Sequence, residues 1–192
     1  MDINLIIVVV YSYLLGSIPF GLLLTKIFLK KDIRTVGSGN IGTTNVLRTG
    51  NKFLGITTLI LDLFKGYISV LITIFYFESL ISLSALLCFI GHIFPVWLKF
   101  KGGKGVATYL GVILALSYKF FLIFGITWLV LSFLFRYASL SSVISSLIVF
   151  VYSYFFINNF SLMLFIFFVI IVYTHRENIV RLKNSKESKI KL

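Results

Sequence analysis

Three stretches of the 192-residue chain place glycines, cations and hydrogen-bonding side chains close together. They read VGSGNIGTTNVLRTGN at 36–51, GHIFPVWLKFKGGKGVAT at 91–108 and THRENIVRL at 174–182. Glycines permit tight turns that expose backbone N–H groups, and Lys and Arg supply positive charge. All three stretches are therefore candidate sites for a phosphate or another oxyanion.

The first stretch contains G-x-G-x-x-G at Gly37, Gly39 and Gly42, the pattern of a dinucleotide-binding loop. That pattern has its meaning only between a strand and a helix of a βαβ unit, and the apolar runs on both sides leave no room for one. We predict instead a loop that contacts an anion through Arg48 and orients it through its neutral polar side chains. These are Ser38, Asn40, Thr43, Thr44 and Asn45. An ordinary solvated loop with turn glycines would look the same, and this alternative stays open.

The second stretch places Lys101 and Lys104 around the glycine pair Gly102 and Gly103, just before an apolar helix. Backbone amides, ammonium groups and a helix N-terminus can converge on a phosphate in such a place. It is not a Walker A loop, because that motif needs glycine at position 98 and Ser or Thr at position 105. His92 precedes the loop and is interpreted either as a packing residue or as a catalytic one.

The third stretch contains His175, Asn178 and Arg181 at three-residue intervals, which would share one face of a helix. Histidine titrates near neutral pH, so His175 is the natural candidate to move a proton or to contact a phosphate. The alternative is a basic anchor for anionic lipid, which we prefer for the lysines that follow. These are Lys183, Lys186, Lys189 and Lys191.

The elements that must position these stretches are membrane helices. Hydrophobic residues make up 59% of the chain and charged residues only 12%, with a mean hydropathy of +1.04. A soluble domain is about half apolar and about a quarter charged. The net charge of +12 therefore indicates loops that face anionic lipid headgroups, and no nucleic-acid partner is expected.

We predict an all-α integral membrane protein with seven transmembrane helices in one domain, 1–192, with a basic tail from about 174 to 192. The apolar runs are Ile3–Leu24, Phe53–Phe77, Ser79–Leu98, Val106–Tyr118, Phe120–Phe135, Tyr137–Ile157 and Phe160–Tyr173. With the N-terminus outside and the C-terminus cytoplasmic, every Lys and Arg except Lys65 and Lys119 reaches the cytoplasmic side. A single crossing by 106–135 would place the basic tail outside, against this bias. The three candidate stretches then all lie in the cytoplasm.

Three residues inside the apolar runs need separate interpretation. Asp62 and Lys65 are ionisable residues three positions apart within a span, where such residues are costly. We interpret them as an ion pair that braces the site rather than as catalytic groups. Cys88, the single cysteine, is expected to be a buried and inert thiol.

The first run is expected to be a retained span and not a signal peptide.

Taken together, GSIPFG at 16–21, GSGNIGTTNVLR, LDLFKG at 61–66, GHIFPVWLKFKGGKGVAT and HRENIVRL resemble the bacterial membrane acyltransferases that acylate glycerol 3-phosphate with acyl-phosphate. The motifs occur in family order and span almost the whole chain. Thr43, Thr174 and Ser185 depart from the family pattern, and Ser185 lies two residues before the acid Glu187.

The resemblance implies direct transfer of a fatty acyl group to the sn-1 hydroxyl of glycerol 3-phosphate, the first step of phospholipid synthesis. The products are 1-acyl-glycerol 3-phosphate, which is lysophosphatidic acid, and phosphate. Acyl-phosphate is already activated, so no acyl-enzyme is required. The partners expected are glycerol 3-phosphate, fatty acyl-phosphate and membrane lipid, at the cytoplasmic face of the bacterial inner membrane, with no cofactor and no metal.

The resemblance also distributes roles among the residues of the three stretches. Ser38, Arg48, Lys104 and His175 are the expected catalytic residues, although a substrate phosphate oxygen could take the proton in place of His175. The expected substrate-binding residues are Asn40, Thr44, Asn45, Lys101, Gly102, Gly103, Ser139, Ser142 and Asn178.

Two other functions are weighed against this one. A transporter of a small phosphorylated anion is the main alternative, but its usual inverted repeats and broken midplane helices are not evident in the sequence. A non-catalytic scaffold would show neither transport nor transfer. Among acyltransferases, those that use acyl-thioesters carry His-x-x-x-x-Asp, whereas His92 and His175 are followed at that spacing by Trp97 and Val180. This difference favours acyl-phosphate over acyl-CoA as the donor.

Overall fold

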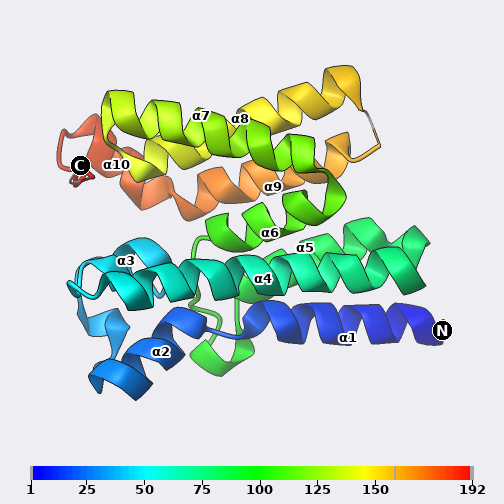
Figure 1. The fold of residues 1–192 in the computed structure, drawn as a ribbon, viewed down its shortest axis with the longest axis horizontal. Helices are drawn as coiled ribbons and strands as arrows, with labels where there is room; N and C mark the ends of the chain where they lie inside the picture. The colour runs from blue at the N-terminus through cyan, green and yellow to red at the C-terminus, as the bar shows by residue number, and fades with distance from the viewer. Residues whose placement is uncertain (1, 158, 191–192) are drawn as a thin grey trace. The chain divides into compact units, whose positions relative to one another are not determined.

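The computed structural model describes residues 2–157 and 159–190, and all regular secondary structure within these ranges is helical (Figure 1). The predicted all-helical class is therefore confirmed. The chain forms two compact units, residues 1–115 and 116–192, which are described separately below.

The first unit contains three long helices and several short ones around them. Its elements are α1 (Ile3–Ser17), α2 (Phe20–Leu29), η1 (Ile33–Thr35), α3 (Thr43–Leu47), α4 (Lys52–Tyr76), η2 (Glu78–Leu80), α5 (Ile81–Ile93), η3 (Val96–Leu98) and α6 (Val106–Leu116). Helices α1, α4 and α5 pack against one another, and α2 and α3 pack against α4.

The first apolar run, predicted as a span over Ile3–Leu24, corresponds to one candidate span, Ile3–Leu29, which consists of two helices. Helix α1 ends at Ser17, Ile18 is extended at φ −65° and ψ 116°, and α2 begins after Pro19. The residue before a proline is disfavoured in the helical region, and proline has no N–H to donate. The break therefore follows from Pro19, and α2 continues to Leu29.

Glycines bring the long helices of the first unit into close contact. A side chain at Gly16 would overlap the backbone of Cys88, and one at Gly91 would overlap the carbonyl oxygen of Tyr13. Small residues at such positions let helix backbones approach closely in membrane proteins. Cys88 is fully buried in this contact, as predicted.

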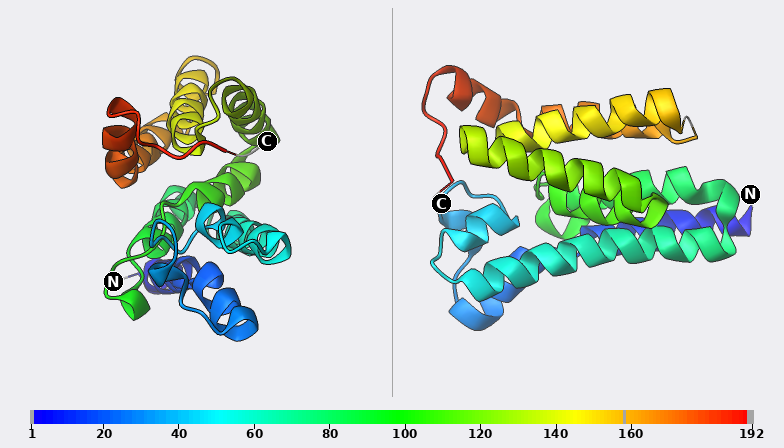
Figure 2. Two further views of the ribbon diagram at one scale, coloured as in Figure 1. Left: turned by 90° about the vertical axis from the view of Figure 1, so that its left-hand side faces the viewer. Right: turned by 45° about the horizontal axis from the view of Figure 1, so that its top comes forward.

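The second unit is built from α7 (Tyr118–Phe135), α8 (Ala138–Phe156), α9 (Ser161–Thr174) and α10 (Arg176–Lys183). Helix α8 packs against both α7 and α9 (Figure 2). The chain bends by 58° between α9 and α10, so α10 leaves the direction of the apolar helices. The tail then returns to the start of this unit, because the N–H of Ile190 donates to the carbonyl oxygen of Arg136 at 2.7 Å.

Five helical segments among the described residues are long and apolar enough to cross a bilayer, and the bent α9–α10 pair is a sixth if counted as one span. The predicted division of the region 106–135 into two helices is confirmed, with the break at Ser117. Helix α6 is apolar but only 11 residues long. The count of seven crossings and the orientation of the ends therefore stay predictions.

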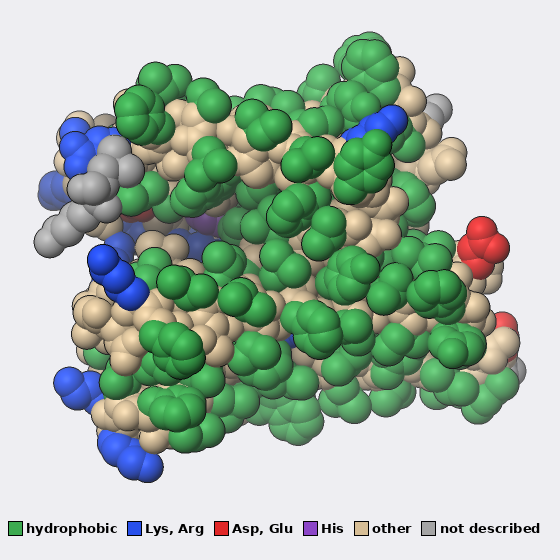
Figure 3. All heavy atoms as spheres, in the orientation of Figure 1, with side chains coloured by type: hydrophobic (Ala, Val, Ile, Leu, Met, Phe, Trp, Pro, Cys, Tyr) green, Lys and Arg blue, Asp and Glu red, His purple; other side chains and the backbone are tan. Residues whose placement is uncertain are grey.

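The surface has the character of a protein that lies in lipid. Apolar side chains cover the long sides of the helices, and in the first unit Lys and Arg side chains gather at the end that holds α2 and α3 (Figure 3). Phe53 and Phe64 on α4, for example, expose 73% and 54% of their surface. Apolar side chains exposed to this extent along a helix are stable in hydrocarbon.

Candidate active site

The first candidate loop, residues 36–48, is organised around the side chain of Asn45. Its Nδ2 lies 2.8 to 3.1 Å from the carbonyl oxygens of Ile33, Val36 and Asn40, and its Oδ1 accepts from the N–H of Ser38 at 3.0 Å. Both amide hydrogens are used within the loop. The structure thus gives Asn45 a framework role within the loop, and its predicted contact with substrate stays a prediction.

The glycines of this loop are required by its backbone. Gly37 and Gly39 have φ of +57° and +70°, a region that other residues rarely adopt. A Cβ at Gly37 would overlap Asn45 Oδ1 and would lie 3.0 Å from Cδ of Arg48. The Arg48 side chain therefore lies against Gly37, and Arg48, Ser38 and Thr44 are all exposed on the loop surface.

Asn40 shapes the entry into α3. Its Oδ1 accepts from the N–H of Gly42 at 2.9 Å, which is a local turn that asparagine readily makes. Gly42 is the N-cap of α3, so Thr43 and Thr44 form the first turn of that helix. The predicted ligands of this stretch are thus brought together on one short loop and one helix start.

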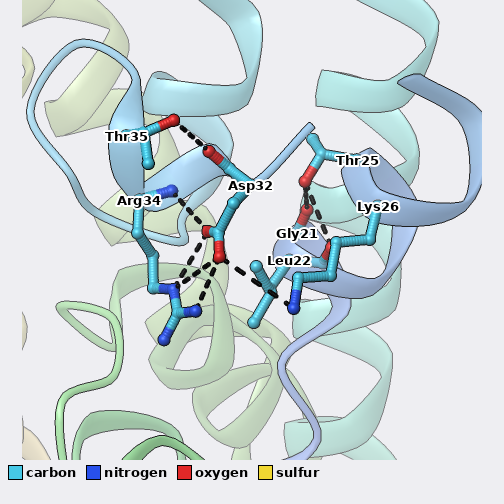
Figure 4. A network of polar contacts seen from close by, with 7 residues as sticks. All are labelled: Gly21, Leu22, Thr25, Lys26, Asp32, Arg34 and Thr35. Carbon is cyan, nitrogen blue, oxygen red and sulfur yellow. Dashed lines mark hydrogen bonds and ion pairs between the residues drawn. The ribbon is translucent and has the colours of Figure 1, made fainter. Parts of the chain in front are cut away.

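An ion-pair cluster precedes the loop (Figure 4). Asp32 accepts from Nε and Nη2 of Arg34, at 2.9 and 2.6 Å, and lies 3.9 Å from Nζ of Lys26. The hydrogen bonds from Arg34 lower the pKa of Asp32 to about 2. The charges of Arg34 and Lys26 face this carboxylate, so we do not add them to the candidate anion site.

The second candidate loop follows α5 and is held by α5 itself. The N–H groups of Gly102 and Gly103 donate to the carbonyl oxygens of Ile93 and His92, at 2.9 and 3.0 Å. The prediction that these two amides point at a substrate therefore needs correction, because they close the C-terminal end of α5. Lys101 is exposed and Lys104 is half-buried on either side of them.

The two loops of the first unit share an apolar base. Leu22, Ile33, Ile41, Val46 and Leu54 form a buried cluster under the first loop. Leu98, which lies just before the second loop, packs against the same cluster. Arg48 and the pair Lys101 and Lys104 are thus carried by loops that rest on one core.

Replacing Asn45 with alanine is expected to lower the free energy of unfolding by about 2 kcal/mol or more. The reason is that its hydrogen bonds to four backbone groups are lost, each with a net contribution of about 1 kcal/mol. Thermal unfolding in detergent measures the change. Thr49→Ala, which removes one local bond to the carbonyl oxygen of Val46 and a longer one from the N–H of Asn51, serves as the control and should cost less. Equal stability of Asn45→Ala and wild type would contradict the framework role.

The third candidate stretch lies in the second unit at the bend between α9 and α10. His175 is the N-cap of α10 and is buried, and its Nδ1 lies 2.8 Å from the carbonyl oxygen of Ile171. A carbonyl can only accept, so Nδ1 carries a proton in this arrangement. Asn178 and Arg181 lie on α10 itself, as the spacing predicted.

Glu187 joins the polar residues of the second unit. Its Oε1 accepts from Nδ2 of Asn178 at 2.6 Å and from Oγ of Ser139 at 3.0 Å, and its Oε2 accepts from Nε of Arg181 at 2.8 Å. Its side chain is 8% exposed. In the sequence, Glu187 matches an acid of the family pattern but receives no role. Its neighbours in the sequence do not predict that the tail folds back onto α8 and α10.

The pKa of Glu187 is shifted by opposing effects. Burial raises it, but the hydrogen bonds from Asn178, Arg181 and Ser139 together outweigh burial and leave it below its ordinary value of 4.5. Its stabilising effect is therefore complete above about pH 4.5 and is lost only as the pH falls through the lowered pKa. Glu187 consequently stays ionised wherever the enzyme would be assayed.

Glu187→Gln is expected to lower activity by about tenfold or more and to lower the melting temperature. The neutral amide would direct its own N–H groups at donors of Asn178 or Arg181, and the ion pair would be lost. Glu177→Gln is the matched control, since Glu177 is exposed and 3.9 Å from Nη1 of Arg181. If both variants behaved alike, the assignment of Glu187 would be wrong.

Ser142 lies inside the second unit rather than at its surface. Its Oγ donates to the carbonyl oxygen of Ala138 at 2.8 Å and accepts from Nε1 of Trp128 at 3.1 Å. Ser142 is buried because α7 and α8 pack against each other at this position. The predicted contacts of Ser139 and Ser142 with donor phosphate stay predictions, and Ser139 lies beside Glu187.

Known proteins match this chain over a range that includes all three candidate stretches. The family model described as glycerol-3-phosphate acyltransferase matches residues 6–185. The chain is 54% identical to the glycerol-3-phosphate acyltransferase of Pelagibacter ubique over 97% of this chain and 98% of that protein. It is 51% identical to the one of Mesorhizobium japonicum, over 99% and 98%.

Solved structures agree with this match. The fold is similar, with a TM-score of 0.92 and 38% identity, to a crystal structure of PlsY (YgiH), an integral membrane glycerol 3-phosphate acyltransferase, in its glycerol 3-phosphate form. That likeness covers 97% of this chain and 95% of the other. A lysophosphatidic acid form of the same enzyme matches with a TM-score of 0.89. The chain therefore belongs to the glycerol-3-phosphate acyltransferase family.

Proposed function

We propose that the chain transfers a fatty acyl group from acyl-phosphate to the sn-1 hydroxyl of glycerol 3-phosphate. The products are lysophosphatidic acid and inorganic phosphate, and the reaction takes place at the cytoplasmic face of a bacterial inner membrane. The main support is the match over almost the whole chain to an acyltransferase solved with glycerol 3-phosphate. The absence of His-x-x-x-x-Asp from the sequence favours the acyl-phosphate donor.

The chemistry proposed is direct attack of the acceptor hydroxyl on the acyl carbonyl carbon. The hydroxyl oxygen forms the new ester bond, the bond from the carbonyl carbon to the phosphate oxygen breaks, and phosphate leaves with the electron pair. The hydroxyl proton passes to His175 or to a phosphate oxygen. No acyl-enzyme is needed because acyl-phosphate is a mixed anhydride.

Cations are the main requirement of such a reaction, because both substrates are anions and must be brought together. Arg48, Lys101 and Lys104 are proposed to neutralise the phosphates, and Ser38, Asn40 and Thr44 to orient them. Asn45 supports the first of these loops from within. In the second unit, His175 and Asn178 are proposed to contact the acceptor, with Asn178 held by Glu187.

Seven crossings with the N-terminus outside are proposed as the topology. This arrangement places the loop 36–48, the loop 101–105 and α10 on the cytoplasmic side, and it satisfies the positive-inside bias. The proposal requires that α6 and α9, which are not among the five long apolar segments, also cross the membrane.

The purified protein in detergent tests the proposed function. We expect phosphate release from acyl-phosphate that depends on glycerol 3-phosphate, with one lysophosphatidic acid formed for each phosphate. Uptake of glycerol 3-phosphate into liposomes without any product would instead show a transporter. Release of phosphate at the same rate without the acceptor would show a hydrolase and would contradict the proposal.

A further inference from the structure

A cluster of buried ionisable side chains lies inside the first unit, beneath the second loop. Asp62 and Lys65 come from α4 and His92 from α5, and they expose only 2%, 3% and 4% of their surface. Nζ of Lys65 lies 2.9 Å from Oδ1 of Asp62, which confirms the predicted pairing of these residues. Oδ1 of Asp62 also lies 3.6 Å from Nδ1 of His92.

Lys65 neutralises the carboxylate and is itself held in place. Its Nζ donates to the carbonyl oxygen of Ile18 at 2.7 Å and lies 5.6 Å from the centre of the Phe20 ring. Ile18 is the extended residue between α1 and α2, so its carbonyl is available outside a helix. A buried charge needs this kind of compensation, and Asp62 therefore has a fixed position from which to face His92.

His92 in turn lies directly against the glycine loop. A Cβ at Gly103 would overlap Nε2 of the imidazole, and the carbonyl oxygen of His92 accepts the N–H of Gly103. The two ring nitrogens therefore face different groups, with Nδ1 toward Asp62 and Nε2 toward the loop. The orientation of this ring determines how closely the backbone between Lys101 and Lys104 can approach α5.

Nδ1 of His92 is buried and makes no hydrogen bond within the part of the chain that is described, and it faces Oδ1 of Asp62, the oxygen that is paired with Lys65. Their separation is just beyond hydrogen-bonding distance, so the interaction is electrostatic and sensitive to small movements of the ring. A shift of Asp62 on α4 would therefore move the His92 ring, and the ring would move the loop at Gly103.

We propose that Asp62 is a positioning residue that acts through His92 to hold the loop 101–105, so that Lys101 and Lys104 are presented to a substrate phosphate. The proposal rests on the proposed function, because it names what that loop binds. It assigns Asp62 and His92 no contact with the reacting atoms. Loss of the cluster should therefore weaken binding of glycerol 3-phosphate more than it slows the chemical step.

A charge-neutral double variant, Asp62→Leu with Lys65→Met, is the principal test. Replacing both members of a buried ion pair by apolar residues is often neutral or stabilising, whereas removing one partner is strongly destabilising. We expect a folded protein whose KM for glycerol 3-phosphate rises about tenfold or more, with a smaller change in kcat. Hydrogen exchange at the amides of Gly102 and Gly103 should also accelerate.

The control is a buried polar pair of the same unit that does not touch the loop. Oγ of Ser12 lies 2.8 Å from Oγ of Ser84, between α1 and α5. The double variant Ser12→Ala with Ser84→Ala should shift the melting temperature but leave KM and the exchange of the loop amides unchanged. This comparison separates positioning from general destabilisation.

Substitutions of His92 test the proposal without altering the ion pair. Asparagine keeps a polar group near the place of Nδ1 and leucine does not, so His92→Asn should retain a KM closer to wild type than His92→Leu does. A folded ion-pair variant with wild-type KM, or equal kinetics for the two His92 variants, would overturn the proposal.

Failure of the proposed function would look different. The wild-type protein would then show no transfer that depends on glycerol 3-phosphate, while the exchange experiment would still report whether the cluster holds the loop. Unchanged exchange of the Gly102 and Gly103 amides in the folded double variant would overturn the positioning role even in that case.

Discussion

Replacing Arg48 or Lys104 with alanine is expected to lower kcat/KM for acyl transfer by about 30- to 1,000-fold while the protein stays inserted and folded. Each cation is proposed to face a substrate phosphate, and loss of such a charge-assisted contact costs about 2 to 4 kcal/mol. Arg48 is exposed on its loop and Lys104 is half-buried, so neither is a large part of a core. Steady-state kinetics with the purified variants measure the effect.

Two neighbouring cations provide matched controls. Lys52 is the first residue of α4 and is exposed, and Lys99 is exposed before the second loop. Lys52→Ala should have little effect. Lys99→Asn should also have little effect, because asparagine tolerates the φ of +51° at this position. Wild-type rates in both Arg48→Ala and Lys104→Ala, or equal losses in the controls, would end the model of two phosphate-binding loops.

His175→Gln is expected to raise KM for glycerol 3-phosphate by about tenfold or more, and to keep the fall in rate at acid pH. The His175 ring is oriented by a hydrogen bond from Nδ1 to the carbonyl oxygen of Ile171. This acceptor is neutral, whereas the histidine of a catalytic triad is oriented by a carboxylate. An activated anhydride also needs little help from a base. A substrate phosphate, with a second pKa of about 6, then produces the acid limb in wild type and variant alike.

The pH profile of kcat distinguishes this binding role from general base catalysis. If His175 is the base, the fall in rate at acid pH should vanish in His175→Gln. Glu187 does not confuse the measurement, because its pKa lies below 4.5. Unchanged KM, a kcat lower by about a hundredfold and no acid limb would make His175 the base.

The helices were largely predictable because the bilayer imposes long apolar runs. The run Phe53–Phe77 corresponds to α4 at Lys52–Tyr76, and the run Tyr137–Ile157 to α8 at Ala138–Phe156. The break at Pro19 was missed since hydropathy does not change there, although proline was a local signal for it. Hydropathy therefore finds helices more reliably than it finds their interruptions.

The candidate site was predictable in its residue types and less so in their roles. Asn45 was identified as polar and close to Arg48, but its acceptors at Ile33 and Val36 depend on how the loop closes. Glu187 gains its role only when the tail returns to Ser139. The pairing of Asp62 with Lys65 follows from helical spacing, and this pairing was found.

The identity of the acyl donor is the most direct test of the proposed reaction. The purified protein should be given glycerol 3-phosphate with either acyl-phosphate or acyl-CoA of the same chain length, and lysophosphatidic acid should be measured. We expect product from acyl-phosphate, with one phosphate released for each, and no product from acyl-CoA. Efficient transfer from acyl-CoA, or none from acyl-phosphate by the folded protein, would contradict the account.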